Sequence, residues 1–199
     1  MKTSLIVTAD DFGLHEAINE AVSKGSAAGV LTAASLMVGA PATADAVRRA
    51  RELPELRVGL HLVMADGWAV LPRRLIPALV DEDGRFADRL FLDGIRYATL
   101  PKVRLQLEAE IRAQFAAFAR TGLLLDRVNA HKHFHLHPTL LNIIVRIGRE
   151  FGMHAIRVPD EPLWFSTRGA IFAGAANAAL LAPWLAMMKW RLRGGGHCL

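Results

Sequence analysis

The sequence has a single cysteine, Cys198, so no disulfide bond can form within the chain. A protein without disulfides suits a reducing compartment, and we expect a cytoplasmic location. The N-terminal stretch, MKTSLIVTADDFG, has only a short apolar run before two aspartates, so we expect no signal peptide. Internal repeats and low-complexity linkers are also missing. These absences exclude a disulfide scaffold and a repeat architecture.

Acidic residues are outnumbered by basic ones, which gives a formal net charge of +5 and an isoelectric point near 10.0. The basic residues are spread along the chain, with a basic stretch at 189–193. Neither a nucleic-acid-binding motif nor an aromatic-basic repeat accompanies them, so we expect no nucleic-acid partner. The simplest interpretation is a solvated basic surface, and the alternative is contact with anionic lipids.

The 199 residues are 52% hydrophobic and 22% charged, as in an ordinary globular protein, and we expect one domain over residues 1–199. Residues 64–100 contain prolines, glycines and the turn sequence Asp-Glu-Asp-Gly, which predicts a long loop excursion. Elsewhere, short apolar runs alternate with segments at helical spacing, which predicts an α/β fold whose parallel sheet is open or closed into a barrel. The expected strands are 4–10, 33–39, 56–63, 123–131 and 154–159, and the expected helices are 15–29, 42–54, 101–122 and 138–152.

Side chains suited to catalysis fall at three of the predicted strand ends. Asp10 and Asp11 end the first strand, His61 lies near the end of the third, and four histidines occupy alternate positions at 131–137. Functional groups of parallel α/β folds collect at the carboxyl ends of the strands, so we expect these side chains to share one face. A carboxylate with two imidazoles is a common shell for a divalent metal. A second carboxylate can then take the proton of an attacking water.

Each part of this prediction has a structural alternative. An Asp-Asp pair after a strand is often a turn or a helix cap, and a lone histidine such as His61 in an apolar strand is more often a core residue. The four histidines could instead form a pH-sensitive surface or reflect composition alone. Because Pro138 is expected to begin a helix, the preceding strand should end near His131 or His133. We therefore expect one or two of the four to bind a metal, while the others support the ligands, face substrate or are exposed.

Three motifs in this order, TADDFG at 8–13, GLHL at 59–62 and AHKHFH at 130–135, resemble the YdjC-like carbohydrate deacetylases. The resemblance extends over residues 3–195, and the stretch 8–42 is similar to the hopanoid-biosynthesis-associated branch, HpnK. This resemblance implies a distorted (β/α) TIM-like barrel with parallel strands. It also implies a hydrolase that removes N-acetyl groups from amino sugars with the help of a metal.

Carried over by position, the resemblance implies that Asp10 is the catalytic base and that Asp11, His61 and His131 bind the metal. Asp10 would deprotonate the water that attacks the acetyl carbonyl. The family implies Mg²⁺, whereas the two imidazoles also suit Zn²⁺ or another transition metal. For the HpnK branch, the implied substrate is an N-acetylglucosaminyl hopanoid lipid. Asn129 departs from the family's pattern, because many relatives have an aspartate at this position.

The C-terminal part also departs from that pattern. Relatives continue further and have a late His-Pro motif, which His197 does not provide, so we expect a barrel that is incomplete at its C-terminus. Residues 169–193 are an uncharged segment with a basic end, and we expect an apolar helix that packs on the barrel or lies at the inner membrane surface. The expected partners are an acetylated amino sugar or glycolipid, the membrane periphery and further copies of the chain in a homo-oligomer.

Two other functions remain open at this stage. One is a different metal-dependent hydrolase on a β/α barrel, such as a phosphoesterase, and the other is a truncated relative that binds metal or sugar without turnover. Every version with a metal requires that Asp11, His61 and His131 converge on one cation, although the first and last lie 120 residues apart.

Overall fold

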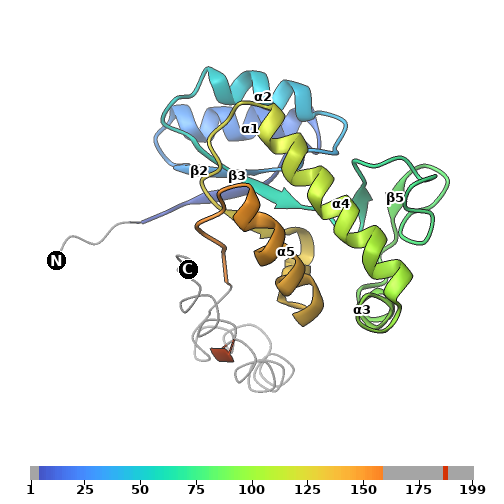
Figure 1. Cartoon of the computed structure of the whole chain (residues 1–199). Helices are drawn as coiled ribbons and strands as arrows, with labels where there is room; N and C mark the ends of the chain where they lie inside the picture. Colours follow the sequence, from blue (N-terminus) through green and yellow to red (C-terminus); the bar gives the residue numbers. More distant parts are fainter. Residues whose placement is uncertain (1–4, 159–185, 188–199) are drawn as a thin grey trace, which may run out of the picture. The chain divides into compact units, whose positions relative to one another are not determined.

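The computed structural model describes residues 5–158 and 186–187 (Figure 1). The chain divides into two units, residues 1–153 and 154–199, and the helices and strands named below all belong to the first. In the second unit, residues 154–158 contain only isolated bridge positions in place of the expected strand. The expected apolar helix at 169–193 lies outside the described residues, apart from the helical pair 186–187.

Four parallel strands in sequential order form the central sheet, which confirms the predicted α/β class. They are β1 (Thr8–Phe12), β2 (Ala33–Leu36), β3 (Arg57–Leu62) and β6 (Val128–Ala130). All of β2 and nearly all of β3 is buried, as expected for a parallel sheet covered by helices. Among the described residues the sheet is open, with β1 and β6 at its edges. Closure into a barrel therefore stays a prediction.

The sheet is strongly curled. Neighbouring strands of a flat sheet lie about 4.8 Å apart, which would place β1 and β6 about 14 Å from each other. Yet the Asn129 side-chain amide in β6 lies 3.0 Å from the Asp10 carboxylate in β1, and the Arg127 guanidinium lies 2.9 Å from the Thr8 hydroxyl. Two short side chains such as Asn129 and Asp10 can meet only if the edge strands bend toward each other. This curvature brings the strand ends together.

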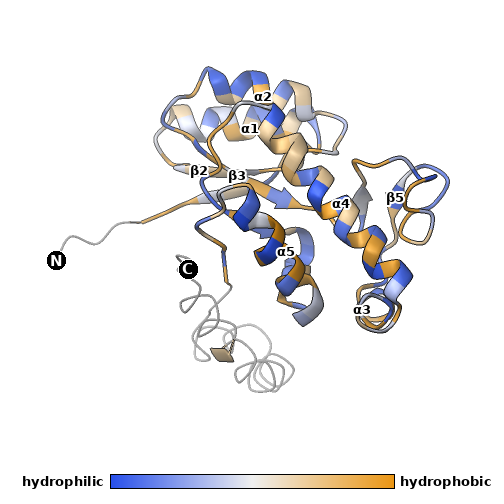
Figure 2. Cartoon of the chain, viewed as in Figure 1, coloured by the Kyte–Doolittle hydropathy of each residue, from blue (hydrophilic) through white to orange (hydrophobic). Residues whose placement is uncertain are grey.

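Helices follow the strands at the predicted places. They are α1 (Glu16–Ala27), α2 (Thr43–Arg51), α4 (Pro101–Arg120) and α5 (Pro138–Glu150). Pro101 and Pro138 stand at the first helical position, where the missing N–H costs no hydrogen bond. Figure 2 shows hydrophilic and hydrophobic residues together on α1 and α2, as expected for helices with one buried side. No helix in the described part of the chain is long and apolar enough to span a bilayer.

Three predicted strands differ from the structure by two or more residues at an end, whereas β3 differs from its prediction, 56–63, by one residue at each end. The first continues past Asp10 to Phe12, with an irregular register between Ala9 and Phe12. The second ends at Leu36. The fourth was expected over 123–131 and includes only three residues, because the preceding leucines do not reach the core and Leu124 is 91% exposed. Apolar composition alone therefore overestimated this strand.

The excursion, residues 64–100, has secondary structure of its own, so its prediction as a plain loop was wrong. It contains β4 (Gly67–Trp68) and β5 (Arg85–Phe86), an antiparallel pair, and then α3 (Leu90–Thr99). The Arg85 guanidinium lies 4.3 Å from the centre of the Trp68 ring, a cation–π contact that ties the two strands. The excursion is therefore an ordered part of the fold.

A row of polar side chains on α4 holds the excursion by its backbone. Gln106, Glu110 and Gln114 are spaced four residues apart and so share one face of the helix. Gln106 and Glu110 accept from backbone N–H groups within 70–78, and Gln114 bonds to the backbone of Val63, directly before the excursion. The carboxylate of buried Glu110 accepts from the two consecutive N–H groups of 70–71, at 2.8 and 2.9 Å. Burial raises the pKa of this carboxyl, and the N–H donors oppose that shift.

We expect Glu110→Ala to lower the free energy of unfolding by about 2 kcal/mol, because two partly buried N–H groups would lose their acceptor. Urea unfolding followed by circular dichroism measures the change. Glu108→Ala on the same helix is the matched control, since Glu108 makes a partly exposed ion pair with Arg146, 2.7 Å long. Its loss should cost about 0–1 kcal/mol. Equal losses in the two variants would contradict a structural role for Glu110.

Candidate metal centre

The predicted site residues come from three strands of the curled sheet. Asp10 and Asp11 belong to β1, His61 to β3 and Asn129 to β6. His131 follows β6 directly and begins η1 (His131–Leu136), a short 3₁₀ helix. The strand before the histidines thus ends at the point predicted from Pro138. The carboxyl ends of β1, β3 and β6 therefore deliver all these side chains to one place.

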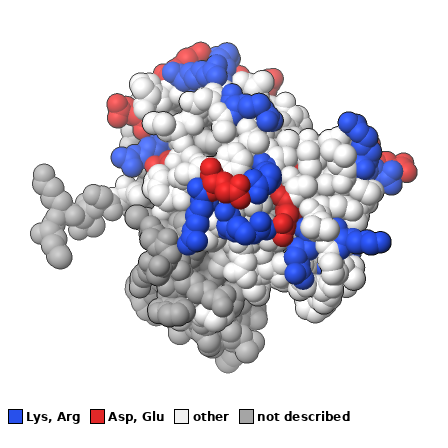
Figure 3. Space-filling model, viewed as in Figure 1, with Lys and Arg blue, Asp and Glu red and all other residues white. Residues whose placement is uncertain are grey.

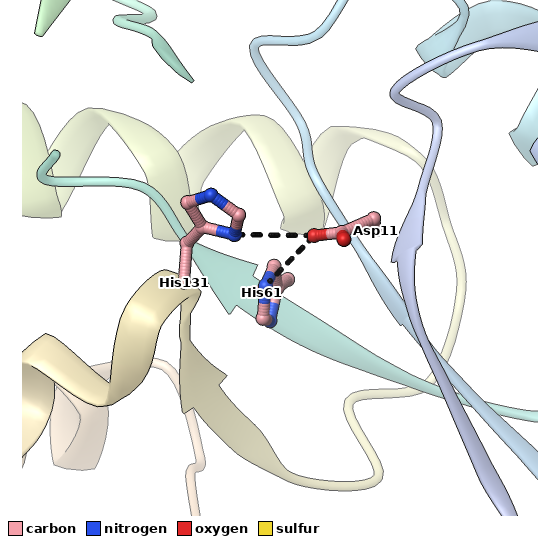
Figure 4. A group of neighbouring side chains, drawn as sticks. All are labelled: Asp11, His61 and His131. Atoms are coloured by element: carbon pink, nitrogen blue, oxygen red, sulfur yellow. Dashed lines mark ion pairs between the residues drawn. The ribbon is translucent and has the colours of Figure 1, made fainter. Parts of the chain in front are cut away.

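Asp11, His61 and His131 meet there (Figure 4). The Asp11 Oδ1 atom lies 3.3 Å from His61 Nε2 and 3.2 Å from His131 Nδ1, and one ligand atom from each residue lies within 4.8 Å of the others. Bonds of about 2.0–2.2 Å from one ion, at angles between octahedral and tetrahedral, separate adjacent ligand atoms by about 2.8–3.6 Å. The two measured distances have that size.

The backbone at Asp11 explains how two consecutive aspartates serve the same site. Neighbouring residues of a regular strand point to opposite faces of the sheet. Asp11 has φ 59°, in the left-handed region, and the register of β1 is irregular at this point. Lys132 and His133, directly after His131, also have left-handed φ values of 53° and 54°. Non-glycine residues rarely adopt this conformation, and such strain concentrates at functional sites.

A chain of hydrogen bonds joins His61 to Asp10 through a buried amide. The Asn129 Nδ2 group donates to Asp10 Oδ1 over 3.0 Å, and the Asn129 Oδ1 atom lies 2.7 Å from His61 Nδ1. A carboxylate only accepts hydrogen bonds, so the NH₂ group of Asn129 must face Asp10 and its oxygen must face His61. His61 therefore donates from Nδ1, and the lone pair of its Nε2 is directed at Asp11.

This arrangement leaves two acceptors facing each other. His61 Nε2 and Asp11 Oδ1 are both buried and have no hydrogen-bond donor, although they lie 3.3 Å apart. Unpaired buried acceptors are costly, and a cation between them removes the cost. One carboxylate and two imidazoles thus fit a divalent ion.

The other three histidines of the 131–137 cluster do not join this group. His133 and His135 lie edge to face, with ring centres 6.1 Å apart, and His135 is fully buried. His137 packs beside Gly94, where an added Cβ would lie 3.3 Å from its ring, and burial lowers the pKa of its imidazole. Only His131 of the four lies with Asp11 and His61, within the expected one or two.

Lys132 is a residue of this region that the sequence did not single out. Its Nζ atom lies 2.7 Å from Asp66 and 2.7 Å from Asp88, both in the excursion. These carboxylates, Asp66 first, raise the pKa of the lysine. The pairing holds the excursion beside His131. No spacing in the sequence indicates it, and the only signal was the position of Lys132 inside the AHKHFH motif.

Comparisons with known proteins show which proteins this chain resembles. The chain is 37% identical over 160 residues to a carbohydrate deacetylase of Brevibacillus brevis, covering 80% of this chain and 59% of the relative. It is 38% identical over 151 residues to a carbohydrate deacetylase of Vibrio cholerae, covering 74% and 56%. The chain thus spans less than two thirds of the length of these relatives.

A solved structure from Enterococcus faecalis, described as a candidate cellobiose-phosphate cleavage protein, superposes with a TM-score of 0.66. It is 23% identical and the match covers 92% of this chain and 74% of that one, so the likeness concerns the fold alone. The family model described as YdjC-like protein matches residues 4–196. The chain is therefore a member of the YdjC-like family.

Proposed function

We propose that the protein is a metal-dependent deacetylase that removes the acetyl group from an N-acetylated amino sugar. The observation that carries this proposal is that Asp11, His61 and His131 lie together, with the Asp11 Oδ1 and His61 Nε2 atoms buried and without a hydrogen-bond partner. Asn129 joins Asp10 to the same group. The carbohydrate deacetylases among the relatives support the class of substrate. We also propose that the curled sheet is part of a distorted (β/α) barrel.

In this proposal Asp11, His61 and His131 hold a divalent ion, which supplies Lewis acidity for an acyl carbonyl and for a water. Asp10 accepts the proton of the attacking water. The hydrogen bond from Asn129 sets the direction of the Asp10 carboxylate, and burial of His61, only 2% exposed, keeps bulk water from competing for its ring nitrogen. Family resemblance favours Mg²⁺, and two imidazoles also suit Zn²⁺ or another transition metal.

We propose further that the sugar is attached to a lipid, an N-acetylglucosaminyl hopanoid, because residues 8–42 resemble the HpnK branch. The proposal includes peripheral contact with the inner membrane and a homo-oligomeric state. In the view of Figure 3, basic and acidic side chains are interspersed over the described surface. A contact with anionic lipid would therefore depend on local groups of side chains more than on the net charge.

Acetate release from an N-acetylglucosaminyl lipid tests the proposed reaction. The purified chain should release acetate, lose this activity in EDTA, and regain it when Mg²⁺ or Zn²⁺ is restored in excess over the chelator. Comparing the two ions identifies the better one, and free N-acetylglucosamine in parallel shows whether the lipid matters. Release of phosphate from an aryl phosphate, without acetate from either sugar, would replace the proposal with a phosphoesterase. Metal binding without either product would leave a binding protein.

A further inference from the structure

We infer that Asn129 is a positioning residue that sets two groups at once, the tautomer of His61 and the direction of the Asp10 carboxylate. The inference rests on the proposed function for the roles of those two residues. It concerns a position where this chain has an amide, and it assigns that amide a task that neither a carboxylate nor an apolar side chain can perform.

The fold leaves Asn129 little freedom. Its side chain is fully buried, and in the parallel register of β3 and β6 it is the direct partner of His61. Its two hydrogen bonds, 2.7 Å to His61 and 3.0 Å to Asp10, bridge 68 and 119 residues of sequence. The amide therefore connects the third strand of the sheet with the first, across the curled sheet.

The amide is suited to this place because it has one acceptor and one donor end. The oxygen requires a proton on His61 Nδ1, which leaves the Nε2 lone pair for the cation. The NH₂ group requires an acceptor, which the Asp10 Oδ1 atom provides. An aspartate at position 129 could still accept from His61, but it would place a carboxylate against the carboxylate of Asp10. An alanine would leave both His61 and Asp10 without this partner.

Because aspartate keeps the contact with His61 and alanine loses both contacts, the two substitutions should differ in metal affinity and in kcat. For Asn129→Asp, we expect Zn²⁺ affinity within about threefold of the wild type, because the His61 contact survives, whereas kcat for acetate release should fall at least about tenfold with KM little changed. For Asn129→Ala, Zn²⁺ affinity itself should fall about 10- to 100-fold, the usual effect of removing a partner behind a metal ligand. Zn²⁺ alone, followed by isothermal titration calorimetry, measures the affinity.

The tautomer of His61 gives a readout that a merely structural role would not move. In the metal-free wild type, ¹⁵N NMR should show His61 protonated at Nδ1, with its signals assigned by their absence from His61→Gln. In Asn129→Ala this preference should weaken, and in Asn129→Asp it should persist. Thr121→Ala is the control, because the Thr121 hydroxyl also makes two hydrogen bonds, to the Phe118 carbonyl and from the Leu123 N–H, but at the C-terminal end of α4 and before β6 begins. It should alter stability and leave the tautomer and Zn²⁺ affinity unchanged.

Protonation of His61 at Nε2 in the metal-free wild type would overturn the inference, as would unchanged Zn²⁺ affinity in Asn129→Ala. If Asn129→Ala does not fold, Asn129→Asp tests the inference. In that variant, loss of the preference of His61 for protonation at Nδ1, or a kcat equal to that of the wild type, would contradict the inference. The measurements of the His61 tautomer and of the Zn²⁺ affinity do not require an active enzyme. If both behave as expected and no acetate is released from any substrate, the proposed reaction fails and the positioning role stands.

Discussion

Asp10→Asn is expected to lower kcat for acetate release by about 10²–10⁴-fold while leaving the affinity for Zn²⁺ within a few-fold of the wild type. The asparagine has nearly the same shape and can still accept the hydrogen bond from Asn129 through its oxygen. It cannot take a proton from water. Steady-state assays of acetate and titration calorimetry with Zn²⁺ measure the two quantities separately.

Asp83→Asn is the control for this substitution, because Asp83 is an exposed carboxylate in the turn before β5 and should leave kcat unchanged. Acetate release at the wild-type rate from Asp10→Asn would refute the assignment of Asp10 as the base. Loss of Zn²⁺ affinity together with kcat would instead make Asp10 a ligand, so the calorimetry distinguishes the two roles of the adjacent aspartates.

His61→Ala and His131→Ala should each weaken Zn²⁺ binding by about 10²–10³-fold. A structural zinc site with four ligands is worth about 10–16 kcal/mol, which corresponds to about 2.5–4 kcal/mol for each ligand. Both imidazoles face the same Asp11 oxygen, so we expect similar losses from the two variants. Competition with a chromophoric chelator measures affinities in this range.

His15→Ala is the matched control for the histidine variants. The His15 side chain accepts a hydrogen bond from the Ala17 N–H, 3.1 Å long, and caps α1. Its loss should cost about 1 kcal/mol of stability and leave Zn²⁺ affinity unchanged. Wild-type affinity in either His61→Ala or His131→Ala would show that the three side chains meet for a structural reason without forming a metal site.

Much of the first unit could be predicted from the sequence because local patterns and burial agree there. The runs around Ala34 and Leu60 are apolar because both faces of the sheet are covered, and prolines mark the starts of α4 and α5. The rule that parallel strands present functional groups at their carboxyl ends placed Asp10, Asp11, His61 and the histidine cluster on one face. The resemblance to the YdjC-like family then singled out Asp11, His61 and His131. The structure brings these three within a few ångströms, as that rule predicts.

The rest depended on contacts that leave little local pattern. The excursion is ordered by side chains of α4 such as Glu110. Glu110 lies 40 residues after Val70 and 39 residues after Leu71, whose N–H groups it binds. Lys132 pairs with aspartates that have no fixed spacing from it. Asn129 stood out only as a departure from a family pattern, and the curled sheet was needed to show that it reaches Asp10. Such contacts follow from tertiary structure alone.

The bond between the two edge strands has a consequence for how the protein is made. Asp10 leaves the ribosome before Asn129, which follows 119 residues later, and His131 comes directly after that amide. An intermediate with only β1, β2 and β3 lacks the second imidazole and the amide. The nascent polypeptide therefore cannot bring Asp11, His61 and His131 together until β6 has docked and the sheet has curled.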